Sequence, residues 1–355
     1  MFEKLNPFSG PSAVSEVTEL RIYPIKSCRG ISIKKSYLTR RGLDLDRRWM
    51  FVDAETLKFV TIRDISEMTL IDTAFTSTSD TSSSAPSPTS PTSDSDAEQL
   101  IISIRNTDKK VMVPARPTTQ WLEDNTELKQ VNIWEYITDG YIYSDTINNV
   151  FTDLFKKPVK LVYKGPTPRI LRGNGAPELL GREESTNFPD VMPLQIANEA
   201  SIKELNQRLK EKGHEEITIE RFRPNIIVKG ADTTRSDDKA PGAWSEDSWK
   251  TVRILDGEQP SGIVSMLGGR NKGLEIDVQA RCARCQVPNV DPETAEKDKH
   301  EPWDTLVSYR RVDEGIKWKP CFGMLSAPRN EGPIAVGMKF EVTETTDAHK
   351  YVKGF

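Results

Sequence analysis

The sequence predicts a mainly β (α+β) protein with two β-barrel-like domains and a few peripheral helices. Most structured stretches are short runs rich in β-branched and aromatic residues, and Gly, Pro or Asp stand at the breaks. Only two segments have the 3.6-residue periodicity of an amphipathic helix. A Gly- and Pro-containing stretch, residues 165–189, separates two such strand-rich halves. These three observations favour a two-domain β-rich architecture.

The first half of the chain is predicted to form a series of strands, followed by one helix and a further strand. QVNIWEYI (130–137) and YIYS (141–144) flank TDG, which indicates a hairpin turn. Residues 145–158 place five apolar side chains on one face of a helix, with Asp145 as a candidate N-cap. The remaining expected strands are 19–25, 30–38, 48–54, 69–75, 99–105, 109–115 and 159–165.

One segment is almost purely Ser, Thr, Asp and Pro. It covers residues 76–98 and lies between two strand-like runs. Such a composition cannot bury enough apolar area to offset the entropy of ordering the chain. We expect a disordered insert at a strand connection inside one domain; an interdomain linker is the alternative.

The second half opens with a helix, residues 198–213, that ends at a glycine. Residues 231–248 read as another polar loop. The expected strands of this half are 223–230, 249–255, 274–280 and 335–344.

Composition excludes several classes of protein. A net charge of −4 gives no general electrostatic reason to expect nucleic acid as a partner. Four cysteines are too few for a disulfide scaffold in 355 residues, which favours a reducing compartment. The N-terminus lacks the pattern of a secretory signal and has no Arg, and no run reaches the ~18 apolar residues of a membrane span. We therefore expect a soluble, cytoplasmic protein.

The sharpest motif is RCARCQVPNVDPET, residues 281–294. Structural zinc would need two more ligands at defined spacing, and a thioredoxin-like pair would need a helix that VPNVDP cannot begin cleanly. Two small buried cysteines near a turn remain possible, and this is the favoured interpretation for Cys282. For Cys285 the flanking arginines favour a thiolate, a soft ligand suited to a redox metal.

Further cations gather next to expected strands. YPIKSCRG places Lys26, Ser27 and Arg29 just past a strand end, and Arg47 and Arg48 of DRRW stand at a strand start. RFRPN, residues 221–225, adds two arginines and an asparagine. Lys and Arg are natural partners of phosphate. Each cluster alone reads as a solvated surface, but loops at barrel ends often converge on one site.

These motifs resemble a known family. LRIYPIKSCRG with DRRWMFVD is similar to the opening of the β-barrel domain found ahead of MOSC domains, and FRPNIIVKG, RCARCQVPNVDPETA and AVGMKFEV resemble the MOSC domain itself. The layout looks like the mitochondrial amidoxime-reducing components and their fungal relatives. The implied organisation is a flexible N-terminus (1–17), an N-terminal barrel domain (18–165, with the insert 76–98), a MOSC domain (166–345) and a tail (346–355).

The resemblance implies a pterin-based molybdenum cofactor between the two domains, with Cys285 as the metal ligand. Asp190 falls where relatives carry an Asp near the metal. Val191, Met192 and Ala283 depart from the family pattern, in which small hydroxylated residues are common. The implied contacts with the pterin and its phosphate are Lys26, Ser27, Arg47, Arg223, Asn225 and Arg284.

The implied reaction is the two-electron reduction of a small N-hydroxylated substrate, such as an amidoxime or hydroxylamine. The chain has no ferredoxin cysteine spacing and no Gly-x-Gly-x-x-Gly loop, so electrons must come from a separate donor. The family suggests cytochrome b5 with its flavin reductase. The alternatives are a molybdenum-cofactor carrier or sulfur-transfer module with a persulfide on Cys285, and a β-rich interaction module regulated through the insert. The membrane anchor of the animal relatives is not recognisable, which favours the cytoplasm over association with mitochondria.

Overall fold

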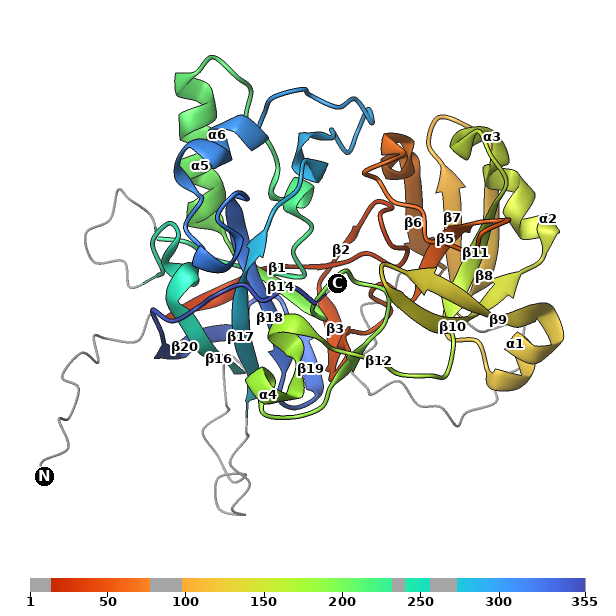
Figure 1. Cartoon of the computed structure of the whole chain (residues 1–355), viewed down its shortest axis with the longest axis horizontal. Helices are drawn as coiled ribbons and strands as arrows, with labels where there is room; N and C mark the ends of the chain where they lie inside the picture. The colour runs from red at the N-terminus through yellow and green to blue at the C-terminus, as the bar shows by residue number, and fades with distance from the viewer. Residues whose placement is uncertain (1–13, 77–97, 232–239, 256–272, 355) are drawn as a thin grey trace, which may run out of the picture.

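The structure is a computed structural model that describes residues 14–76, 98–231, 240–255 and 273–354. Strands account for 39% and helices for 22% of it, which confirms the mainly β class. Two β units lie side by side, and the longest helix, α5, packs on the outside of one of them (Figure 1). Residues 77–97 of the expected insert and residues 232–239 of the expected polar loop lie outside the described residues.

The larger unit is a closed barrel of seven strands. It closes because the first strand, β1, pairs with β20 through its first residues and with β15 through its middle residues. All neighbours are antiparallel except β14 and β15, and the short strand β2 (Ile31–Ile33) extends the sheet from β1. The barrel strands are β1 (Val14–Ile22), β14 (Leu194–Asn198), β15 (Ile226–Val228), β16 (Trp249–Leu255), β17 (Leu274–Ala283), β18 (Cys321–Pro328) and β20 (Lys339–Thr345).

The smaller unit consists of two antiparallel sheets. Its four-stranded sheet has the order β5-β11-β10-β9 and its three-stranded sheet the order β6-β7-β8. Their strands are β5 (Trp49–Asp53), β6 (Ile71–Phe75), β7 (Gln99–Ile104), β8 (Lys110–Pro114), β9 (Thr126–Ile133), β10 (Tyr136–Tyr143) and β11 (Val159–Lys164). Small sheets complete the fold: β3 (Lys35–Thr39), β4 (Gly42–Leu43) and β19 (Gly332–Ala335), then β12 (Arg169–Ile170) with β13 (Ser185–Thr186).

The helices are peripheral and, apart from α5, short. Helix α5 follows β14 directly, and the side chain of Asn198 caps its N-terminus by accepting from Ala200 N. The α-helices are α1 (Thr119–Asn125), α2 (Asp145–Asn148), α3 (Thr152–Phe155), α4 (Pro177–Leu180), α5 (Glu199–Glu211) and α6 (Trp303–Tyr309). The 3-10 helices are η1 (Ser66–Leu70), η2 (Asn149–Phe151), η3 (Gly173–Gly175), η4 (Ile219–Phe222), η5 (Ser245–Ser248), η7 (Val287–Asn289) and η8 (Glu314–Ile316).

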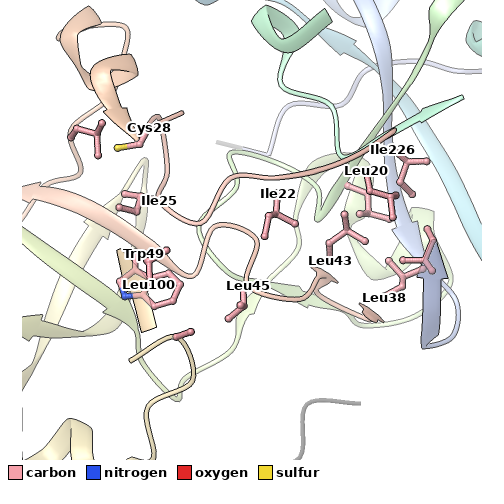
Figure 2. Close-up of a cluster of buried hydrophobic side chains, with 14 of the residues drawn as sticks. Leu20, Ile22, Ile25, Cys28, Leu38, Leu43, Leu45, Trp49, Leu100 and Ile226 are labelled. Atoms are coloured by element: carbon pink, nitrogen blue, oxygen red, sulfur yellow. The ribbon is translucent and has the colours of Figure 1, made fainter. Parts of the chain in front are cut away.

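The main hydrophobic core runs through both units. Trp49 and Leu100 belong to the smaller unit and Leu20 and Ile226 to the barrel, yet all four are fully buried in one cluster. Ile22 lies between the two groups, on the segment that leaves the barrel for the smaller unit (Figure 2). Continuous burial of this kind holds the units in a fixed relation, which a site built from both of them requires.

Several local expectations were wrong. TDG (138–140) lies inside β10, and the hairpin instead turns at Trp134 and Glu135, because Ile133 pairs with Tyr136. Gly140 serves close packing rather than a turn, since a Cβ there would collide with the Val162 side chain.

The expected helix 145–158 forms as α2, η2 and α3, with Ser144 rather than Asp145 at the N-cap. Its five apolar residues still pack against the core as expected: Ile147, Val150, Phe151, Leu154 and Phe155. The expected strand 335–344 is divided by a turn at Gly337 into β19 and β20. Strand β18 and helices α1 and α6 were not expected.

Both chain ends contain residues that pack against the rest of the protein. Residues 14–17, assigned to a flexible N-terminus, begin β1 because they pair with β20 and β15. In the C-terminal tail the Tyr351 side chain is buried, and its backbone N–H donates to Asp313 Oδ1 over 2.8 Å. The described part of the tail is therefore packed against the barrel.

Candidate functional site

Cys285 lies just past the end of β17, where the chain leaves the barrel toward η7. Its side chain is half-buried and lines a cavity of about 210 Å³. Two residues from the smaller unit, Ile62 and Arg63, form the opposite wall, so the cavity lies between the units. The other lining residues are Gln286, Val287, Val290 and Lys297.

Arg63 connects this cavity to Asp190. Its Nη2 donates to Asp190 Oδ2 over 2.7 Å, and its guanidinium stacks 4.8 Å from the centre of the Trp134 ring. Burial alone would lower the pKa of Arg63, but the Asp190 carboxylate and the Cys285 sulfur beside it raise that pKa instead. The arginine thus sets a fixed positive charge between the cysteine and the carboxylate.

Asp190 is held as a carboxylate by three donors. Lys26 Nζ forms an ion pair with Oδ1, and Trp134 Nε1 donates to the same oxygen over 3.1 Å. Arg63 forms an ion pair with Oδ2. Burial would raise the pKa of Asp190, but Lys26 and Arg63 outweigh it and hold that pKa far below its usual range. At neutral pH this group accepts hydrogen bonds and does not donate a proton.

Lys26 is itself almost fully buried. Its Nζ also donates to the Phe188 carbonyl over 2.9 Å, and burial lowers its pKa to about 8 although Asp190 opposes the shift. The next residue, Ser27, is buried with a backbone φ of 69°, a left-handed conformation that is costly for a non-glycine residue.

Arg47 and Arg223 form a second cationic group around Tyr23. Their guanidinium carbons lie 4.3 and 4.2 Å from the centre of the tyrosine ring. Asp46 pairs with Arg47 over 2.7 Å, whereas Nη2 of Arg223 has no hydrogen-bond partner among the described residues. Both arginines have left-handed backbones, with φ of 48° and 59°.

The two cationic groups are joined through one short segment. The backbone N–H of Phe188 donates to the Arg47 carbonyl over 3.0 Å, and the Phe188 carbonyl accepts from Lys26 Nζ. Asp190 follows two residues later. The segment NFPD (187–190) therefore places the carboxylate next to both clusters.

Two of the residues expected to contact the cofactor form hydrogen bonds that stabilise the fold. Asn225 is buried; its side chain accepts from Gln195 N and donates to the Arg21 carbonyl, so it links β1 and β14. Arg284 points inward, where it donates to Gln195 Oε1 over 3.0 Å and to the Phe222 carbonyl over 2.9 Å. The structure brings Cys285, Asp190 and Lys26 together, while these two side chains support the loops around them.

Cys282 differs from Cys285 in its surroundings. Its sulfur accepts from Arg284 Nη1 over 2.9 Å and packs at the edge of a buried apolar cluster. Burial raises its pKa, although Arg284 partly opposes this. Val191, Met192 and Ala283, the departures noted in the sequence, belong to or border the same apolar cluster. We find no group of three or more His, Cys, Asp or Glu able to hold a metal ion within the described ranges.

Sequence reasoning missed Arg63, Trp134 and Lys297. Arg63 lies in TIRD (61–64), beyond β5, and nothing in that tetrapeptide marks it as a site residue. Nothing in the sequence marks Trp134 as a site residue before the structure is known. Trp134 lies in the turn of the β9–β10 hairpin and has a left-handed φ of 56°. Both residues reach the site from the smaller unit.

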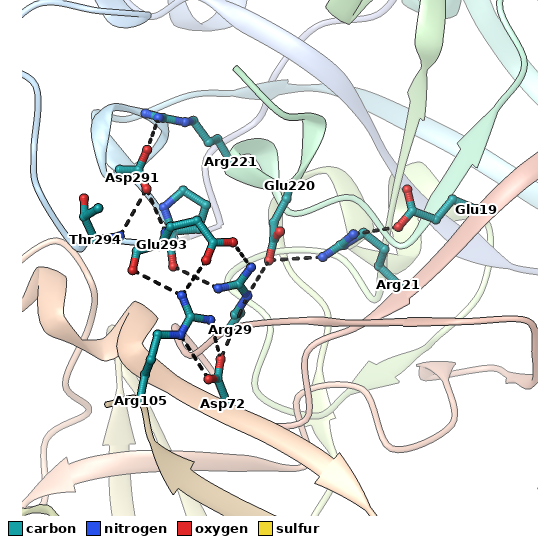
Figure 3. Close-up of polar contacts among 11 residues, drawn as sticks. Glu19, Arg21, Arg29, Asp72, Arg105, Glu220, Arg221, Asp291, Glu293 and Thr294 are labelled. Carbon is teal, nitrogen blue, oxygen red and sulfur yellow. Dashed lines mark hydrogen bonds and ion pairs between the residues drawn. The ribbon is translucent and has the colours of Figure 1, made fainter. Parts of the chain in front are cut away.

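An ionic network fixes the loop that carries Cys285. Glu293, in the same loop, pairs with Arg29 and with Arg105, and the Arg105 guanidinium reaches Asp72 over 2.7 Å (Figure 3). On the other side of the loop, Asp291 pairs with Arg221 of the barrel unit over 2.7 Å. The loop is thus held from both units.

None of the helices in the described part of the chain is long and apolar enough to cross a membrane.

Comparison with known proteins finds several relatives that match most of this chain. The human mitochondrial amidoxime-reducing component 1 is 28% identical over 334 residues, which cover 91% of this chain and 82% of its own length. The mouse protein of the same name is 27% identical with coverages of 91% and 81%. The molybdenum cofactor sulfurase of Arabidopsis thaliana is 30% identical over 86% of this chain, but the match spans 32% of that longer protein.

Two family models match consecutive parts of the chain. Residues 14–158 match the MOSC N-terminal beta barrel domain, and residues 183–341 match the MOSC domain. Their order is the one that the sequence motifs indicate. This chain therefore belongs to the proteins that combine a MOSC N-terminal β-barrel domain with a MOSC domain.

Proposed function

We propose that this protein is a molybdenum-cofactor-dependent oxidoreductase that reduces small N-hydroxylated compounds. The observation that carries the proposal is the placement of Cys285: one half-buried sulfur lines a cavity between the two units, and Arg63 and Lys297 also line this cavity. The names of relatives support the same chemistry, since several are amidoxime-reducing components.

The residues present fit an anionic cofactor whose metal takes one protein sulfur. Cys285 supplies that sulfur, and no competing metal-binding cluster exists among the described residues. Arg223 has a buried nitrogen without a partner in the described part of the chain, as expected for a group that awaits an anion. Lys26, Ser27 and Arg47 lie on the adjoining segments and would hold the pterin and its phosphate, with Asn225 and Arg284 supporting them.

When bound, the cofactor supplies the two-electron chemistry of N–O reduction. The overall reaction balances as R–NHOH + 2 H⁺ + 2 e⁻ → R–NH₂ + H₂O. In our proposal Asp190 contacts the substrate: as a fixed carboxylate it accepts a hydrogen bond from the N–OH group and orients it. Arg63 keeps Asp190 in place, and Lys26 offsets its charge.

Electrons come from a separate donor in this proposal. The candidates are cytochrome b5 and its flavin reductase. We also propose a cytoplasmic location, with association with mitochondria as the alternative because relatives carry that name. The four cysteines are free, which suits a reducing compartment. Cell fractionation distinguishes the two locations.

Benzamidoxime reduction with the cytochrome b5 system tests the activity. The chain is expressed in a host that makes the cofactor, and wild type, Cys285→Ala and Cys282→Ala are compared. Cys282 is the matched control, because it is three residues away in the sequence, accepts a hydrogen bond from Arg284 and does not line the cavity. We expect activity in wild type and Cys282→Ala and none in Cys285→Ala. Equal activity in all three would refute the assignment.

The likeness to the Arabidopsis molybdenum cofactor sulfurase favours one alternative function, a cofactor carrier or sulfur-transfer module. In that case Cys285 holds a persulfide and the protein turns over no substrate. Metal and pterin analysis separates the two functions. One molybdenum per chain with pterin supports the enzyme, whereas a protein that contains persulfide sulfur without molybdenum supports the alternative.

A further inference from the structure

Trp318 is the most exposed large hydrophobic side chain in the described ranges. It is 79% exposed, in the segment between η8 and β18, and Val312 nearby is 41% exposed. Burial of a tryptophan ring stabilises a protein or a complex, and a ring exposed to water does not contribute this stabilisation. Exposed tryptophans of this kind are enriched at the centres of protein interfaces.

The surroundings of Trp318 are cationic. Arg311, Lys317 and Lys319 are all exposed, and none of them forms an ion pair within the part of the chain that the structure describes. The segment also contains one exposed acidic side chain, Glu314. Because the whole chain carries a net charge of −4, this patch has the opposite sign to the protein average. We call Arg311, Val312, Lys317, Trp318 and Lys319 the Trp318 patch.

The segment that carries the Trp318 patch is hydrogen-bonded to the residue before the candidate metal ligand. Pro320, two residues after Trp318, accepts a hydrogen bond from the backbone N–H of Arg284 over 2.8 Å. Arg284 is the residue that precedes Cys285. In the same segment, Ile316 packs against the apolar cluster that Cys282 and Ala283 also border. A short path of bonds and one hydrogen bond thus leads from the exposed indole to the loop of Cys285.

We propose that the Trp318 patch is the docking surface for an acidic one-electron carrier protein. The proposal rests on the proposed function, since the reduction needs two electrons and this chain offers no donor motif. Two reduced carriers, each oxidised by one electron, supply one N–O cleavage. Unpaired lysines around an aromatic centre suit a small, transient interface, in which opposite charges steer the encounter and the ring anchors it.

Direct binding tests the surface without reference to turnover. Calorimetric titration of oxidised cytochrome b5 into the full chain, at low and at physiological salt, compares wild type with Trp318→Ala and with Lys317→Glu/Lys319→Glu. The matched control is Lys35→Glu/Lys110→Glu, which makes the same change of charge at two exposed lysines on β3 and β8.

We expect the two patch variants to weaken binding at low salt by about tenfold or more, and the control to stay within about twofold. Wild-type binding weakens with salt, whereas binding by the double charge variant does not. Equal binding by wild type and both patch variants would overturn the proposal, and so would a wild type that does not bind.

Activity with two reductants separates this proposal from the proposed function. With reduced cytochrome b5, kcat/KM for the carrier falls about tenfold in the patch variants. With reduced methyl viologen, a small reductant that needs no docking surface, their rate equals that of wild type. If wild type is inactive with both reductants, the proposed function fails, and the titration still decides whether the surface exists. Loss of rate with both reductants in the patch variants alone contradicts docking.

Discussion

Arg63 donates a hydrogen bond from Nη2 to Oδ2 of Asp190 over 2.7 Å, and this contact joins the smaller unit to the segment that precedes the barrel strand β14. Because Arg63 also lines the cavity of Cys285, one guanidinium positions both the carboxylate and the wall that faces the sulfur. The site is therefore assembled by the contact between the units and belongs to neither alone.

Replacing Arg63 by Met should lower activity without unfolding the protein. The guanidinium is about one-third exposed, so the loss of its ion pair costs little stability. Loss of an orienting partner commonly reduces activity by about 10- to 100-fold. Benzamidoxime reduction at saturating donor measures the effect, and Arg63→Lys should restore part of it. Arg41→Met, at an exposed arginine in the β3–β4 turn, is the control. Equal rates for Arg63→Met and Arg41→Met would contradict the positioning role.

Asp190→Asn should destabilise the fold by leaving Lys26 buried without its counter-charge. Breaking a buried ion pair is costly, and we expect a loss of about 2 kcal/mol, because Asp190 remains one-third exposed. Urea unfolding measures the change. The double variant Lys26→Met/Asp190→Asn removes the stranded charge and should be more stable than Asp190→Asn alone. Additive effects in this double-mutant cycle would show that the two residues are not coupled.

Much of the fold could be predicted because most strands carry a local pattern. Alternation and β-branched residues mark β7 and β8, and five apolar residues mark the helical segment after Ser144. Strand β18 has no alternation, since all eight of its residues are buried. The closure of the barrel by β1 is a long-range pairing that no local pattern encodes.

Part of the arrangement around Asp190 could be expected from the family resemblance, although no local pattern encodes it. Lys26 and Asp190, expected in one site, do form an ion pair although they are 164 residues apart in the sequence. Arg63 and Trp134 were missed because only the contact between the units brings them to Asp190. The inward direction of Arg284 also depends on partners, Gln195 and the Phe222 carbonyl, that lie far away in the sequence.

Glu293→Gln should loosen the Cys285 loop while leaving global stability almost unchanged. The side chain is 62% exposed, so its ion pairs with Arg29 and Arg105 are expected to contribute less than about 1 kcal/mol. Nevertheless these pairs tie the loop to the smaller unit. Hydrogen exchange followed by mass spectrometry should show faster exchange across residues 286–298. Glu296→Gln, at an exposed position of the same loop, should leave exchange as in wild type. Identical exchange in the two variants would contradict the role of the network.

Glu246, which is not one of the candidate site residues, should make the stability of the fold depend on pH. Its side chain is fully buried beside Ser201, whose hydroxyl donates to Oε1 over 2.6 Å. Burial raises its pKa from 4.5 to about 7. The folded state therefore binds a proton that the unfolded chain has already released between pH 4.5 and 7, so the contribution of this group to stability is lost as the pH rises through that window.

Glu246→Gln removes the titration and keeps an oxygen for the Ser201 hydroxyl. We expect this variant to be as stable as wild type near pH 4.5 and more stable at pH 8, where wild type must either bury the charge or bind a proton. Unfolding free energies in urea at several pH values measure the difference. Glu314→Gln, at an exposed glutamate, should follow the wild-type profile. A constant difference between Glu246→Gln and wild type from pH 4.5 to 8 would show that Glu246 does not titrate in this range.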